Sequence, residues 1–111
     1  MSVMIKNIPH EQALPITAEV SCQPGQIVSK TLAQNGNHSL TLFAFDQGEE
    51  ISTHASDGDA MVLALDGKAK ITIDGTAHIL RAGETIVMPA KKPHAVYAEE
   101  PFKMLLIVLF N

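Results

Sequence analysis

The sequence predicts a single all-β domain built as a sandwich or a barrel. Short apolar segments recur along residues 26–110, and turn residues such as Asn35-Gly36-Asn37, Asp66-Gly67 and Asp74-Gly75 separate them. Strands at this spacing, with almost no helix between them, are typical of sandwiches and barrels. The length of 111 residues suits one domain, and the hydrophobic content of 46% supports a folded core.

An N-terminal arm, residues 1–25, is expected to precede a barrel that spans residues 26–111. Residues 8–14 predict a short helical turn. Pro9 suits the first position of a helix, Glu11 suits the positive end of its dipole, and Pro15 ends it.

The barrel segments differ in how their apolar residues are spaced. Residues 68–73 alternate, which predicts Ala69, Ile71 and Ile73 on the inner face. Residues 60–65 and 104–110 are apolar at every position, which predicts strands buried on both faces. Further strands are expected at 26–33, 39–45, 76–80, 85–88 and 94–98.

Two segments place a histidine at a fixed distance after a glycine. In the first segment, five residues lie between Gly48 and His54. In the second, five residues lie between Gly83 and Pro89, and four lie between Pro89 and His94. This spacing resembles the two sequence motifs of the cupin superfamily, over roughly residues 38–110. The resemblance implies that residues 1–111 form one cupin domain, a jelly-roll barrel also described as a double-stranded β-helix.

The resemblance also implies a metal site, of which this chain keeps half. His54 and His94 match two of the four ligands of the family pattern. The pattern has a second His where this chain has Ser56, and a Glu where it has Ala60. It also has a Gly in place of Lys91 and an Asn in place of Ala98. A bulge at Gly58 would be needed to turn the Asp59 carboxylate inward as a substitute.

Strand alternation indicates which side chains share the cavity with the histidines. Ser52, His54 and Ser56 are expected on one face of their strand, and His94 and Val96 on one face of a second strand. Both faces are expected to point into the barrel. Two imidazoles facing one cavity suit one divalent ion, either Zn, Fe, Ni, Cu or Mn. Without metal, they are expected to bond Ser52, Ser56 or water. The candidate ligand pocket comprises Ser52, Ser56, Met61, Leu63, Met88 and Val96.

Two functions from different classes are consistent with these residues. The first is a binding protein that holds a small molecule in the barrel, with or without a degenerate metal site. The second is a metal-dependent cupin enzyme, either a dioxygenase, an isomerase or a decarboxylase. Lys91 and Lys92, next to His94, would attract an acidic substrate. The two missing ligands favour the first function.

Charge and hydropathy exclude several partners. The net charge is −4, without a basic cluster beyond Lys91-Lys92, so no nucleic acid partner is expected. The longest apolar run, residues 104–110, is too short to cross a bilayer. A single cysteine, Cys22, and no signal peptide predict a soluble cytoplasmic protein. The same apolar run predicts a homodimer, in which a second subunit covers one face of that strand.

Overall fold

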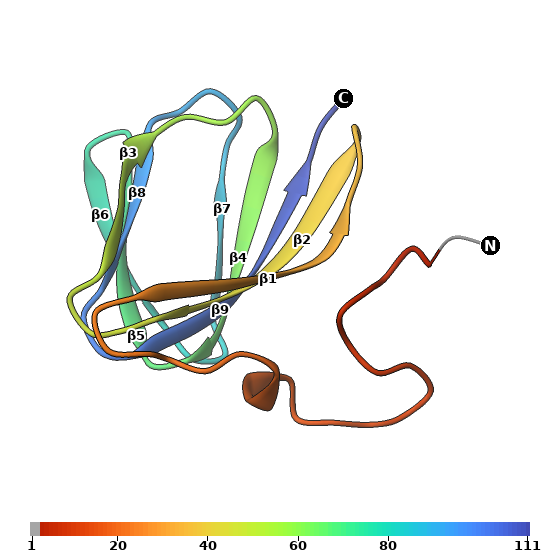
Figure 1. Cartoon of the computed structure of the whole chain (residues 1–111). Coiled ribbons are helices and arrows are strands. Elements are labelled where there is room, and N and C mark those ends of the chain that lie inside the picture. The colour runs from red at the N-terminus through yellow and green to blue at the C-terminus, as the bar shows by residue number, and fades with distance from the viewer. Residues whose placement is uncertain (1–2) are drawn as a thin grey trace.

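The computed structural model describes residues 3–111, and its regular secondary structure consists almost wholly of strands packed as two antiparallel sheets (Figure 1). One 3-10 turn, η1 (Ile16–Glu19), precedes the strands. The strands of the described residues are β1 (Ile27–Gln34), β2 (His38–Phe45), β3 (Glu50–His54), β4 (Asp59–Asp66), β5 (Lys68–Ile73), β6 (Thr76–Arg81), β7 (Thr85–Met88), β8 (His94–Ala98) and β9 (Phe102–Leu109).

The strand order crosses between the two sheets, as in a jelly roll. The five-stranded sheet has the order β1-β2-β9-β4-β7, and the four-stranded sheet has the order β3-β8-β5-β6. Strand β9 thus lies between β2 and β4, and β8 lies between β3 and β5. The predicted all-β jelly-roll class is confirmed.

The three predicted turns form, although one forms for a different reason than expected. Asp74 and Gly75 both have positive φ, at 50° and 82°, as a two-residue hairpin requires. Gly36 and Asn37 do not. Instead, the Asn35 side-chain oxygen accepts hydrogen bonds from the N–H groups of Asn37 and His38, at 2.7 and 3.0 Å. The side chain of Asn35 therefore stabilises that turn.

The helical turn of the arm lies later in the chain than the sequence predicted. Residues 8–14 are irregular, and Glu11 lies in the left-handed region with φ of 58°. A helix cannot pass through that conformation. The turn begins only after Pro15, as η1. Ile8, Ile16 and Val20 of the arm pack instead on the outer face of the five-stranded sheet, together with Leu42 and Leu105.

Burial alternates along β4, so the prediction that both faces of this strand are buried is wrong for the single chain. The outer face of β9 is half-buried at Leu105 and Ile107, and its coverage by a second subunit stays a prediction. Ala60, Val62 and Ala64 of β4 are buried in the core between the sheets, together with residues of β9 such as Met104. Met61 points away from the core and is 38% exposed. Alternate residues of a strand face opposite sides. In an unbroken apolar run the two sets are equally apolar, so the sequence cannot show which set faces the core.

The outer faces of the two sheets differ in chemistry. On the five-stranded sheet, Leu40, Ile107, Met61 and Val87 are register partners in one row across β2, β9, β4 and β7. We call these four residues the apolar row. The corresponding row across the four-stranded sheet consists of Glu50, Tyr97, Lys70 and Ile79. Only the four-stranded sheet carries charged side chains in its row.

Candidate functional site

His54 and His94 are direct cross-strand partners where β3 and β8 meet. His54 is the last residue of β3, and His94 is the first residue of β8. Their ring centroids are 4.5 Å apart, with an edge-to-face angle of 69°. His94 is buried, whereas His54 remains exposed at the edge of the cavity. Residues 40 positions apart in the sequence thus form one pair of imidazoles.

Both rings are held by the same kind of backbone contact. The Nδ1 of His54 lies 2.9 Å from the carbonyl oxygen of Ser52, and the Nδ1 of His94 lies 3.1 Å from that of Lys92. A carbonyl oxygen only accepts, so Nδ1 carries the proton in each ring. In a neutral imidazole the lone pair is then on Nε2. Metal-binding histidines are commonly oriented by such contacts.

Burial keeps His94 in its neutral form. Desolvation by the surrounding apolar side chains lowers the pKa of His94 below its ordinary value of 6.5. The hydrogen bond to the Lys92 carbonyl opposes this shift, and the nearby His54 adds to it. His94 therefore presents an acceptor nitrogen at neutral pH.

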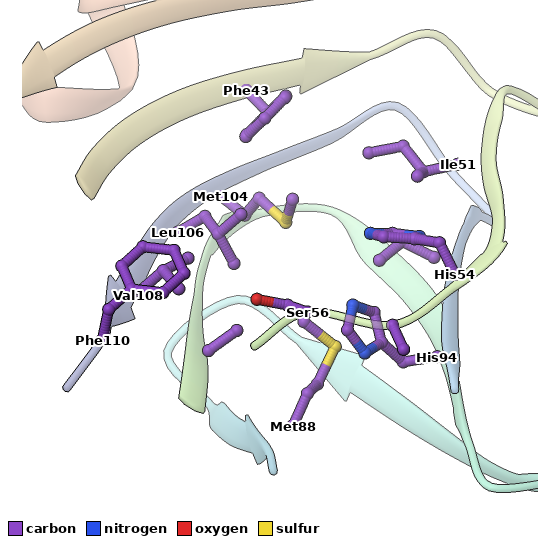
Figure 2. Close-up of a pocket in the computed structure, with 13 residues that line it drawn as sticks. Phe43, Ile51, His54, Ser56, Met88, His94, Met104, Leu106, Val108 and Phe110 are labelled. Carbon is purple, nitrogen blue, oxygen red and sulfur yellow. The ribbon is translucent and has the colours of Figure 1, made fainter. Parts of the chain in front are cut away.

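The two imidazoles border a cavity of about 370 Å³ between the sheets (Figure 2). Ser56 is the third polar residue of its lining. The remaining lining residues are apolar and come from both sheets and their loops: Phe43, Ile51, Ala55, Ala60, Met88, Val96, Met104, Leu106, Val108 and Phe110. In Figure 2 the imidazoles lie at one end of the cavity and Phe110 lies at the other.

Five of the eight residues predicted for the metal site and pocket line this cavity: His54, His94, Ser56, Met88 and Val96. Met61 and Leu63 do not, because Ala60 and Val62 occupy the inward positions of β4. Met61 instead borders a hollow on the outer face.

Ser52 is also outside the cavity, because the register shifts between Ile51 and His54. This irregularity brings both Ile51 and His54 to the cavity. It breaks the simple alternation that had placed Ser52 beside His54. Ser52 contributes its carbonyl oxygen to His54 instead of its side chain.

No carboxylate replaces the two missing ligands of the family pattern within residues 3–111. Asp59 is exposed, and its Oδ1 accepts a hydrogen bond of 2.8 Å from the N–H of Ala90. Asp57 is exposed as well. No group of three or more His, Cys, Asp or Glu side chains suits a metal among these residues. An ion at this place would be held by two imidazoles, and its other positions would be open to water or ligand.

Comparison with known proteins agrees with the fold. The family model described as a cupin domain matches residues 41–108. The conserved SPY1581 protein of unknown function from Streptococcus pyogenes is 46% identical, with a TM-score of 0.97 over 99% of this chain and 96% of that chain. A cupin superfamily protein from Desulfitobacterium hafniense, DSY2733, is 35% identical, with a TM-score of 0.93 over 98% of this chain and all of the other.

A more distant relative has an activity in its name. Dimethylsulfoniopropionate lyase DddW from Ruegeria pomeroyi is 26% identical over 104 residues, which cover 83% of this chain and 68% of that protein.

None of the helices in residues 3–111 is long and apolar enough to span a membrane. With its jelly-roll topology, its two histidine motifs and a family match over most of its length, this chain belongs to the cupin superfamily.

Proposed function

We propose that the barrel binds a small molecule that has an apolar body and one polar group. The observation that carries this proposal is the composition of the cavity. Ten of its thirteen lining residues are apolar, and its polar side chains are His54, His94 and Ser56. Binding sites of this kind bury an apolar ligand and orient it through a few polar contacts.

The imidazole pair determines which polar group fits. With Nδ1 of each ring on a backbone carbonyl, each neutral ring offers an acceptor at Nε2. A hydroxyl, a phenol or another hydrogen-bond donor satisfies such acceptors directly. Backbone carbonyl oxygens already bond Nδ1 of both rings. A ligand would therefore contact the Nε2 atoms.

A divalent ion is the second way to satisfy the same nitrogens. His54 and His94 would hold it, and the polar group of the ligand or water would complete its coordination. Such an ion would act as a Lewis acid that polarises a ligand oxygen. Two protein ligands give a weaker site than the three or four that are usual, so occupancy would depend on the ion supplied.

We further propose that the protein is a homodimer joined through the apolar row. Met61 is 38% exposed and Val87 is 45% exposed, and neighbouring Leu109 on β9 is 60% exposed. Together with Ile107 they border a shallow hollow on the outer face. A second copy that covers this face would remove a contiguous apolar surface from water. The charged row of the four-stranded sheet offers no comparable surface.

The binding proposal can be tested by NMR on protein labelled with 13C-methyl methionine. Met88 and Met104 line the cavity, whereas Met61 lies on the outer face and serves as the internal reference. Propanol, phenol and propionate would be titrated with and without Zn2+. We expect shifts at Met88 and Met104 alone, stronger for the two hydroxyl compounds without metal. His54→Ala should weaken them. Shifts confined to Met61 would refute the proposal.

Catalysis is the alternative function, and the similarity to a named lyase is the observation in its favour. The measurement is consumption of dimethylsulfoniopropionate, followed by proton NMR after the protein is loaded with each of Zn, Fe, Ni, Cu and Mn. His54→Ala and His94→Ala are the controls. Turnover that both variants lose would establish an enzyme. An unchanged substrate with every ion would contradict this lyase activity.

A further inference from the structure

Phe110 lies between the inner cavity and two hollows of the surface. It follows β9 directly, and its side chain is half-buried. It borders the inner cavity and also two surface hollows, both of which include Asp57 and Ala90. Figure 2 shows its ring at the end of the cavity far from His54 and His94.

Two loops hold Phe110 in this position. Its N–H donates a 2.8 Å hydrogen bond to the carbonyl oxygen of Asn37, in the turn between β1 and β2. Its ring lies over Gly58, in the loop between β3 and β4. A Cβ at Gly58 would approach the backbone oxygen of Leu109 to 2.5 Å, and Cδ1 of Phe110 and Cγ1 of Val108 to 2.9 Å each. The end of β9 and the ring that follows it can therefore lie against this loop only because residue 58 has no side chain.

From this geometry we infer that Phe110 sets the length of the ligand that the cavity admits. The inference rests on the proposed function, since it assumes a ligand whose polar group lies at the imidazole pair. The apolar body of that ligand extends along the cavity until it meets the phenyl ring. Removing the ring would join the cavity of about 370 Å³ to an adjoining hollow of about 280 Å³. Longer straight-chain molecules would then fit.

A series of straight-chain alcohols, from n-butanol to n-decanol, tests this inference. Each hydroxyl can bond an imidazole, and each added methylene extends the body. Binding would be read from the methyl signals of Met88 and Met104 in full-length protein. In the unmodified protein we expect affinity to rise about fourfold per buried methylene until the chain reaches Phe110, and then to stop rising. In Phe110→Ala the rise should continue for longer alcohols, and Phe110→Leu should show an intermediate limit.

Ile79→Ala is the matched control. It removes an apolar side chain on the outer face of the four-stranded sheet that is 43% exposed, so the limit should stay where it is in the unmodified protein. An unchanged limit in both Phe110→Ala and Phe110→Leu would overturn the inference while leaving ligand binding intact. If no alcohol shifts Met88 or Met104 in any folded variant, the proposed function fails as well. Melting temperatures establish that each variant is folded.

Discussion

The N–H of Lys91 donates a 2.7 Å hydrogen bond to the carbonyl oxygen of Ser56. This bond joins the loop after β3 to the loop after β7, next to the imidazole pair. Lys91 makes it from the left-handed region, with φ of 68°. The family pattern has a glycine at this position, and glycine adopts that conformation without steric cost. This chain therefore holds a lysine in a conformation that favours glycine.

Lys91→Gly should raise the free energy of unfolding by about 1 kcal/mol. Left-handed backbone costs a residue with a Cβ about 1–2 kcal/mol, and the greater freedom of glycine in the unfolded chain offsets part of that gain. Urea denaturation measures the difference. Lys92→Gly is the control, because Lys92 is not among the residues with positive φ. It should lower stability by about 0.5–1 kcal/mol. Equal losses in the two variants would contradict this explanation.

Divalent metal binding should depend on both histidines. His54→Ala and His94→Ala should each abolish it, because either change leaves one protein ligand. Ser56→Ala should change it little, since the Ser56 hydroxyl already accepts a 3.1 Å hydrogen bond from the N–H of Gly58. Isothermal titration with Zn2+ and Ni2+ measures the affinities. Stoichiometric metal that survives both histidine substitutions would place the site elsewhere.

Restoring the family pattern should strengthen the same site. Ser56 and Ala60 both line the cavity, so Ser56→His and Ala60→Glu together would bring the ligands from two to four. We expect affinity to rise at least tenfold for the double variant. Ala60→Glu alone should destabilise the fold without metal, because it buries an unpaired carboxylate in a core position that is 2% exposed. A double variant that binds no tighter than the unmodified protein would contradict the proposed geometry.

Acid should destabilise the metal-free protein partly through His94. Burial lowers the pKa of His94 below 6.5 in the folded state. The unfolded chain therefore binds a proton at pH values where the folded chain does not. The stability from the neutral ring is complete above pH 6.5, and it is lost as the pH falls below that value. The slope of the unfolding free energy against pH reports the number of protons taken up on unfolding. Between pH 7.5 and 5, His94→Gln should lower that number by up to one. Parallel curves for the two proteins would refute this contribution.

The dimer can be tested with two adjacent residues of β9 that face opposite sides. Leu106 lines the cavity, whereas Ile107 belongs to the apolar row. Leu106→Lys should cost more than about 2 kcal/mol, because it places a charge in the apolar cavity. Ile107→Lys should instead give a folded monomer, which sedimentation velocity would detect. A species of 11.9 kDa for the unmodified protein at micromolar concentration would refute the dimer.

The sequence predicted the fold and the histidine pair because both depend on local patterns. Glycine-bounded segments and the spacing of His54 and His94 can be read without knowing which strands pair. The lining of the cavity was harder to predict. Apolar residues at six consecutive positions of β4 do not show that Met61 faces outward. No local pattern marks the irregularity before His54 that takes the side chain of Ser52 out of the cavity.

Other lining residues depend on contacts between distant parts of the chain. Phe110 reaches the cavity because the turn at Asn37 and the bare backbone of Gly58 hold it there. Neither partner lies near it in the sequence. Met104 lines the cavity because β9 is inserted between β2 and β4, and that insertion is a property of the topology.

The insertion of β9 also has a consequence for how the chain folds. His38 pairs with Leu109, and Asp59 pairs with the same residue from the other side. The middle of the five-stranded sheet is thus filled by a segment that is synthesised after both of its neighbours. Until that segment docks, β2 and β4 each keep an unpaired apolar edge of the kind that recruits other chains. We expect folding on the millisecond-to-second scale of topologies with distant pairings, with this interval as the period in which the chain is most prone to aggregate.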